Sequence, residues 1–214
     1  MNKKEKYSPF FVALVAIYIT VLLISNIAAF KLINFWGVVL TGGTIVFPIT
    51  YILSDVFAEV YGYDKTKKIT FLGFFCCGFA VLVFQLLIKL PYPDHFLYQK
   101  EFATVLSTTL RIFIAGLTAF LLGQLANAYI LNYIKNKSKI KYLWFRTIAS
   151  TIIGELIDTT IFLTIAFIGV LNYQILLFML LCQTLVKVGY EIILTPLLYK
   201  AVAFAKKQED IIHE

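Results

Sequence analysis

Six stretches of this sequence are each long and apolar enough to cross a lipid bilayer as a helix. A helix needs about 20 predominantly apolar residues to span the hydrocarbon core. Ten-residue segments of alternating polar and apolar residues, which build membrane barrels, are absent from the sequence, so helices are the spanning structure that fits. The expected spans cover residues 10–30, 44–61, 70–90, 104–134, 147–171 and 175–204.

Composition supports the same assignment. Of the 214 residues, 60% are hydrophobic and 14% are charged, whereas a soluble domain averages about 25% charged residues. A chain of this kind has too much apolar surface to cover in water, and it is too hydrophobic to be disordered. We therefore expect an all-α membrane protein in which residues 1–214 form a single integral membrane domain with six transmembrane helices.

The basic residues are distributed unevenly between the two sides of the expected bundle. Fourteen of the 19 lysines and arginines fall in the first tail, in the loops after the second and fourth spans, and at or beyond the end of the sixth span. Lys31, Lys89 and Lys100 fall in the opposite loops, while Arg111 and Lys187 lie within spans. Because cytoplasmic loops carry the excess of positive charge, we expect both termini to be cytoplasmic. The net charge of +7 then reflects topology, and no nucleic-acid partner is implied.

Five of the 12 acidic residues fall within the expected spans, where each ionisable side chain costs at least about 2.5–3.5 kcal/mol. Such residues persist when they line a cavity, pair with one another or bind something polar. A spacing of three or four residues places two side chains on one helix face, and four spans each carry such a polar pair. The pairs are Asp55 with Glu59, Gln124 with Asn127, Glu155 with Asp158, and Lys187 with Glu191. A polar pocket shared by these helices is predicted.

Simpler roles compete with a binding role for several of these side chains. Lys187 and Glu191 can neutralise one another as a structural ion pair. Glu59 lies within a turn of the cytoplasmic lysines and can be an interfacial residue. Arg111 enters the fourth span near its outer end, where a long basic side chain can snorkel or pair structurally. These four charged residues are grouped as gating or structural ion-pair candidates, and the amides of the fourth span can equally hold helices together.

Glycine and proline interrupt the apolar run that leads into the second span. Gly42 and Gly43 are followed by Pro48, and both residue types weaken a helix and free backbone polar groups. Two interpretations stay open. The helix can be broken or start late, aiming its polar face at a cavity, or it can start ordinarily with Pro48 in its first turn.

Residues that would carry enzymatic or metal chemistry are missing from the expected spans. The two histidines, His95 and His213, fall in an outer loop and in the C-terminal tail. No zinc-protease helix motif, cysteine–histidine cluster or glycine-rich nucleotide loop occurs in the sequence. The three cysteines are expected to be small packing residues. We therefore expect no enzyme, no metal and no cofactor.

Several strings of residues form a pattern that covers roughly residues 10–200. The first occupies residues 47–63 and includes Phe47-Pro48, Ser54-Asp55 and Ala58-Glu59. The later strings are Gly123-Gln124 with Asn127, Arg146 with Ser150-Thr151, Gly154-Glu155, Asp158-Thr159, Phe162, Ala166-Phe167, and Lys187 with Pro196. In order and spacing they resemble the queuosine precursor transporter family, also called the vitamin uptake transporter family. Lys68 stands where family members often carry arginine, and Asn127 where aspartate is frequent.

The resemblance implies a multi-pass importer in the bacterial cytoplasmic (inner) membrane. Its substrate would be queuine or a 7-deazaguanine precursor of queuosine, a modified tRNA nucleoside, and the cyano and aminomethyl precursors differ from one another by one small substituent. The implied fold is similar to the substrate-binding components of energy-coupling-factor transporters. The alternative is such a component itself, which needs a separate ATPase module. Homo-oligomerisation and an ATPase partner are left open.

A purine-like substrate gives the intramembrane acids a chemical role. A deazaguanine presents an N–H and an exocyclic amine side by side, and one carboxylate can accept both hydrogen bonds. We expect Glu155 or Asp158 to read this edge, with Asp55 close by. The candidate donors to the base carbonyl are Asn26, Gln124 and Asn127, and the candidate stacking rings are Phe47, Tyr51 and Phe162. A second hypothesis is that one of the surplus acids couples transport to protons.

Overall fold

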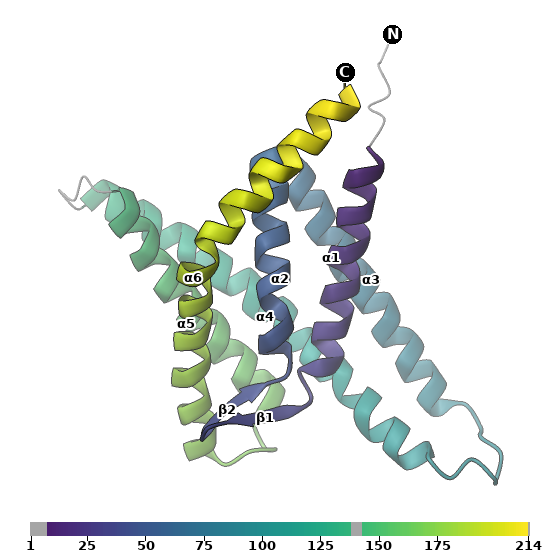
Figure 1. Cartoon of the computed structure of the whole chain (residues 1–214). Coiled ribbons are helices and arrows are strands. Elements are labelled where there is room, and N and C mark those ends of the chain that lie inside the picture. The colour runs from purple at the N-terminus through teal and green to yellow at the C-terminus, as the bar shows by residue number, and fades with distance from the viewer. Residues whose placement is uncertain (1–7, 138–142, 214) are drawn as a thin grey trace.

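The computed structural model describes residues 8–137 and 143–213, which form six α-helices, a short π-helical segment and one β-hairpin (Figure 1). The prediction of an all-α membrane fold with six long helices is confirmed, and the hairpin is an addition to it. The elements in chain order are α1 Pro9–Ala28, β1 Leu32–Phe35, β2 Val38–Thr41, α2 Gly43–Val56, η1 Phe57–Tyr61, α3 Tyr63–Lys89, α4 Gln99–Lys137, α5 Leu143–Phe167 and α6 Tyr173–His213.

Five described helical segments are long and apolar enough to cross a membrane. They are Pro9–Ala28, Gly43–Tyr61, Asp64–Lys89, Gln99–Gly123 and Tyr173–Glu209. The remaining expected span, residues 147–171, falls on α5 and on the turn that follows it. Large apolar side chains cover the outside of the bundle, and Phe75, Leu185 and Ile193 are each 72% exposed. Extensive exposed apolar surface of this kind marks contact with a membrane.

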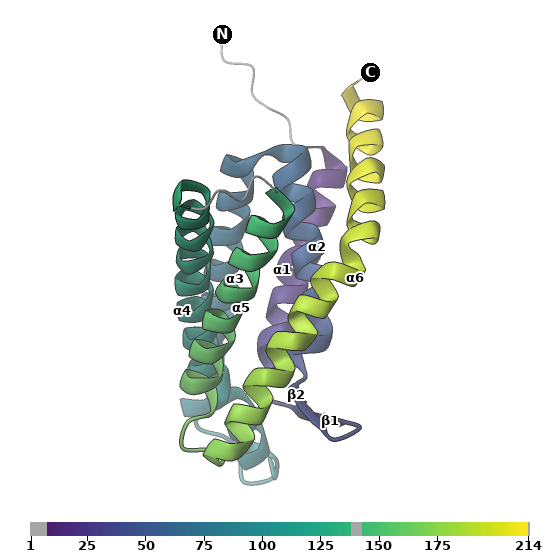
Figure 2. The ribbon, with the colours of Figure 1, turned by 90° about the vertical axis from the view of Figure 1, so that its left-hand side faces the viewer.

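The helices run back and forth between the two ends of an elongated bundle (Figures 1 and 2). α1 begins and α6 ends at the same end of the bundle, where Ser8 and Tyr61 both donate hydrogen bonds to the Glu209 carboxylate. The hairpin, the α3–α4 loop and the α5–α6 turn lie at the opposite end. An even number of crossings requires this arrangement.

Two of the described helices contain a proline in their interior, and a glycine fixes where the first of them begins. α2 starts at Gly43, so Pro48 lies in its second turn, and the interpretation that placed Pro48 in the first turn is wrong. A Cβ atom on Gly42 would lie 2.5 Å from the carbonyl oxygen of Ala28, so the absence of a side chain lets α2 begin against the end of α1. Pro196 lies inside α6, which changes direction along its length (Figure 2), as a proline within a helix favours.

The β-hairpin follows from a two-residue turn between short apolar strands. β1 and β2 pair antiparallel, and Trp36 and Gly37 at the turn have φ angles of 51° and 87°. Two positive φ angles in succession define the hairpin turn that matches the twist of the strands, and glycine adopts such an angle without strain. The Asn34 side chain accepts a hydrogen bond from the Gly37 N–H at 2.9 Å. The strands then pack onto the bundle through Leu32 and Val39.

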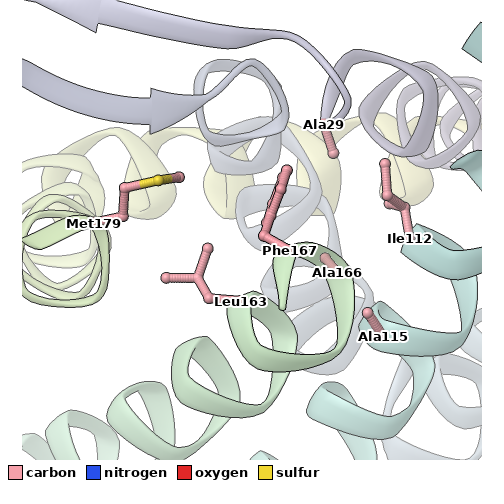
Figure 3. Close-up of a cluster of buried hydrophobic side chains, with 7 residues drawn as sticks. All are labelled: Ala29, Ile112, Ala115, Leu163, Ala166, Phe167 and Met179. Atoms are coloured by element: carbon pink, nitrogen blue, oxygen red, sulfur yellow. The ribbon is translucent and has the colours of Figure 1, made fainter. Parts of the chain in front are cut away.

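Two apolar clusters hold the bundle together. One lies next to the hairpin, where α1, α4, α5 and α6 meet, and Figure 3 shows its buried side chains converging beneath the strands. Its members are Ala29, Ile112, Ala115, Leu163, Ala166, Phe167 and Met179. The other joins α1, η1 and α3 through Phe11, Tyr18, Leu22, Phe57, Ile69 and Cys77. The polar residues of α2, α5 and α6 lie outside both clusters, which leaves them available to line a cavity.

Candidate functional site

A cavity of about 420 Å³ opens between α2, α4, α5 and α6. Its volume falls within the range of about 300–1,000 Å³ that is typical of small-molecule sites. Its lining combines aromatic rings, aliphatic side chains and four charged groups. The lining residues are Tyr51, Ile52, Ser54, Asp55, Phe120, Gly123, Gly154, Glu155, Asp158, Lys187, Tyr190, Leu194, Thr195 and Leu198. The prediction that polar faces of several spans share one pocket thus agrees with the packing of these helices.

One side of the cavity, which we call the paired wall, consists of Glu155, Asp158 and Lys187. The Lys187 Nζ atom lies 2.5 Å from Asp158 Oδ2 and 3.2 Å from Glu155 Oε2, so one ammonium group bridges two carboxylates of α5. The side chains are only 11% exposed for Lys187, 22% for Glu155 and 23% for Asp158. At this depth the Coulomb attraction is weakly screened, and the ion pair ties α6 to α5.

Glu155 has an oxygen atom that is buried and makes no hydrogen bond with the described residues. This atom is Oε2, which lies close to the Lys187 ammonium group but out of hydrogen-bond alignment with it. A buried acceptor without a donor costs about 1–3 kcal/mol, and more when it is charged. The Lys187 ammonium group offsets part of this cost, and a ligand that donates to the Glu155 carboxylate would relieve the remainder.

Another part of the lining, which we call the open wall, consists of Tyr51, Ser54 and Asp55 on α2. Asp55 is exposed, and within the described part of the chain it makes no hydrogen bond or ion pair. The Tyr51 ring stacks on the ring of Phe47 with centroids 6.1 Å apart and planes 25° apart. The open wall therefore combines an uncompensated carboxylate with an aromatic surface.

Glycine sets the distance between α4 and the paired wall. A Cβ atom on Gly123 would lie 2.9 Å from the Cβ atom of Asp158 and 3.2 Å from the carbonyl oxygen of Gly154. Separations below 3 Å require something to shift, so only glycine fits without moving α5. The Gly123 position thus holds the backbone of Asp158 in place against α4.

The region that contains the cavity matches a known protein family. The model of a protein family described as "Putative vitamin uptake transporter" matches residues 41–201 of the chain. The chain belongs to this family. Every residue that lines the cavity, from Tyr51 to Leu198, falls within the matched region. The resemblance seen in the sequence is thereby confirmed, and the family assignment covers the whole site.

Two relatives are both described as "Probable queuosine precursor transporter". The one from Bacillus subtilis is 25% identical over 178 residues, which cover 83% of this chain and 78% of the relative. The one from Haemophilus influenzae is 27% identical over 128 residues, which cover 59% of this chain and 52% of the relative. No solved structure matches the chain. The similarity to substrate-binding components of energy-coupling-factor transporters therefore stays a prediction.

The structure brings four of the predicted binding residues of this family member to the cavity, namely Tyr51, Asp55, Glu155 and Asp158. Lys187, grouped with the ion-pair candidates, joins them there. Its observed partners lie on α5, whereas the sequence suggested Glu191 on its own helix. The side chains of Glu191, Gln124 and Asn127 lie outside the described residues, so their predicted roles stay predictions.

Other predicted residues lie away from the cavity lining. The Asn26 amide donates to the carbonyl oxygen of Leu22 at 3.0 Å and to Cys77 Sγ at 3.7 Å, which satisfies it between α1 and α3. Phe162 packs against the apolar cluster beneath the hairpin, edge-on to Phe167 with ring centroids 6.4 Å apart. Phe47 is also absent from the lining and reaches the site through its contact with Tyr51.

Arg111 and Glu59 have different surroundings from one another. Arg111 on α4 donates from Nε to the carbonyl oxygen of Ile165 at 2.6 Å, and from its terminal nitrogen to that of Ile168. These carbonyls lie in the last turn of α5 and one residue beyond it, where a cation stabilises the helix. Arg111 thus has a structural interaction at the hairpin end. Glu59 is exposed on η1, one turn beyond Asp55, and is not part of the lining.

The lining residues that sequence reasoning missed include Phe120, Tyr190 and Thr195. A signal existed for Tyr190, because it follows Lys187 by three residues and therefore shares its helix face. Phe120 precedes Gly123 by three residues on α4 and shares a face with it in the same way. Helical spacing from the acidic and glycine residues would have found both.

Proposed function

We propose that this protein imports 7-deazaguanine precursors of queuosine across the bacterial cytoplasmic membrane. The proposal is supported by the descriptions of the two relatives and by the chemistry of the cavity. The observation that carries it is the Glu155 carboxylate, which lines a cavity of suitable size and whose Oε2 atom, 3.2 Å from the Lys187 ammonium group, has no aligned hydrogen-bond donor among the described residues.

The paired wall matches the hydrogen-bonding edge of a guanine-like base. The Glu155 carboxylate would accept from the ring N–H and from the exocyclic amine, which lie side by side on such a base. The Lys187 ammonium group has three donors, of which one is used by Asp158. A second donor of this ammonium group lies next to Glu155. It can donate to the carbonyl oxygen of the base, which is adjacent to the ring N–H. Asp158 then acts by holding Lys187 rather than by touching the base.

The open wall supplies a flat surface for the ring of the base. Tyr51 lines the cavity, and its stacked neighbour Phe47 supports the orientation of the Tyr51 ring. Aromatic stacking of a base is worth about 1–3 kcal/mol and discriminates little between bases. Stacking on Tyr51 would therefore add affinity, while the paired wall supplies the selectivity.

The orientation in the membrane follows from the distribution of charge. α1 begins and α6 ends at the end where Ser8 meets Glu209, and the sequence places three basic residues close to each of these two points. Because positively charged segments remain in the cytoplasm, we infer that this end is cytoplasmic and that the hairpin faces outwards. In this proposal the chain is a transporter without enzymatic activity, and the base enters from the hairpin side.

Transport by the purified full-length chain in liposomes tests the proposal. We expect saturable uptake of labelled aminomethyl-substituted 7-deazaguanine, competed by the unlabelled base and unaffected by equal concentrations of riboflavin, thiamine or biotin. Ligand-induced thermal stabilisation should follow the same order. Absence of uptake together with absence of stabilisation by any deazaguanine would contradict the proposed function.

A further inference from the structure

The charges that line the cavity do not balance. Three carboxylates, those of Asp55, Glu155 and Asp158, face a single described cation, Lys187. Lys187 lies within 3.2 Å of both acids of α5 on the paired wall. No described side chain on α4 or elsewhere on α6 adds a positive charge to the lining. With all four groups ionised, the empty cavity carries a formal charge of −2.

Asp55 is the acid that no protein cation compensates. It belongs to α2, whereas Lys187 and its two partners belong to α6 and α5. Nothing in the described part of the chain donates to Asp55, and the next acid along the same helix face is Glu59, which adds negative charge rather than relieving it. An unpaired charge at membrane depth is costly, and a bound cation would relieve that cost.

We propose that the cavity selects a base with a positively charged substituent, with Asp55 of the open wall as its counter-ion. The inference rests on the proposed function, because it assumes that the paired wall holds the guanine-like edge. A base held there and stacked on Tyr51 has its remaining substituent available to the open wall. An aminomethyl group is protonated at neutral pH and gains from Asp55, whereas a cyano group is uncharged and gains nothing comparable.

The expected preference for the aminomethyl base depends on the distance between its ammonium group and the Asp55 carboxylate and on how strongly the surroundings screen the two charges. Two opposite charges about 4 Å apart attract one another strongly at the effective dielectric constants found near protein surfaces. Part of this attraction is lost because the ammonium group must give up water. We therefore expect the aminomethyl base to bind at least about 10-fold more tightly than the cyano base, which corresponds to about 1.4 kcal/mol.

Calorimetric titration of both bases into the full-length protein in detergent tests this inference. In wild-type protein the affinity ratio should favour the aminomethyl base about 10-fold or more, and in Asp55→Asn the ratio should fall to near one. Glu59→Gln is the matched control, because it removes the same charge about one turn away, on η1 and outside the lining; it should keep the preference for the aminomethyl base. Asp55→Glu retains the charge and should retain the preference for the amine.

The other possible results distinguish failure of this inference from failure of the proposed function. Equal affinities of wild-type protein for the two bases would overturn the inference and leave the proposed function intact. A preference that persists in Asp55→Asn would remove Asp55 from the role of counter-ion. Binding of neither base would overturn the inference together with the proposed function. Because the wild-type comparison needs no substitution, a variant that fails to fold does not prevent the test.

Discussion

The two walls of the cavity place acidic residues in opposite electrostatic settings. On the paired wall, Glu155 and Asp158 share the ammonium group of Lys187, and all three side chains are less than a quarter exposed. On the open wall, Asp55 is exposed and has no described partner. The difference separates two tasks. Charges that hold helices together are compensated within the protein, while a charge that is left without a partner is available to a ligand.

Removing the cation of the paired wall should have the largest effect on stability. Lys187→Met leaves two buried carboxylates facing each other without compensation, and removing one partner of a buried ion pair destabilises a protein by about 3–5 kcal/mol. The melting temperature of the purified protein in detergent should fall accordingly. Lys200→Met changes an exposed lysine of the same helix and should leave the melting temperature unchanged. Equal melting temperatures for the two variants would show that Lys187 does not stabilise the wall.

Adding a methyl group at the contact between α4 and α5 should have an intermediate effect. Gly123→Ala places a Cβ atom 2.9 Å from that of Asp158, and overpacking of this kind costs about 1–3 kcal/mol. Gly116→Ala is a matched control in the same helix, because no atom lies within 4 Å of its Cβ position. It should be neutral or stabilise the helix by up to about 1 kcal/mol. Similar stabilities of the two variants, measured by thermal unfolding, would argue against a tight contact at Gly123.

Neutralising the open wall should change stability least. Asp55→Asn removes a charge that makes no described ion pair, so the free energy of unfolding should change by no more than about 0.5 kcal/mol. Asp158→Asn, by contrast, removes a charge-assisted hydrogen bond to Lys187 and should cost about 1.5–3 kcal/mol. Chemical unfolding of both variants side by side measures the difference. A larger loss in Asp55→Asn than in Asp158→Asn would reverse the assignment of the two walls.

The sequence was sufficient to predict the helices and the existence of a shared polar pocket. Apolar length defines each span, and helical spacing places Glu155 with Asp158 and Asp55 with Tyr51 on single faces. Both predictions depend only on local periodicity. The family resemblance could also be recognised from the order of short strings, and the match to residues 41–201 confirms it.

Relations between helices could not be predicted in the same way. Lys187 is four residues from Glu191, but its observed contacts reach Glu155 and Asp158, because the packing of α5 on α6 decides which carboxylates lie within range. Asn26 looked like a donor to a substrate, yet the carbonyl oxygen of Leu22 and the thiol of Cys77 already accept from it. Phe162 shares the spacing of the polar stripe but packs into the apolar cluster with Phe167.

The β-hairpin was missed for a different reason. Its strands have four residues each and lie between two long apolar runs. The apolar pattern that predicts membrane spans gives no separate signal for strands of this length. A local signal was present in the Trp36-Gly37 turn, which is flanked by apolar residues and preceded by Asn34. A two-residue connection ending in glycine favours a hairpin.

The most direct test of the central claim is the affinity of Glu155→Gln for the cyano-substituted base, measured by calorimetry in detergent. The cyano group carries no charge that could pair with Asp55 on the open wall. The affinity for the cyano base therefore measures the contacts with the paired wall. Glutamine keeps the size of the side chain but replaces one acceptor by a donor, and we predict a loss of about 10- to 100-fold in affinity. Glu101→Gln, an exposed substitution in the first turn of α4, should bind as wild type does. Wild-type affinity in Glu155→Gln would contradict the claim that the paired wall reads the base.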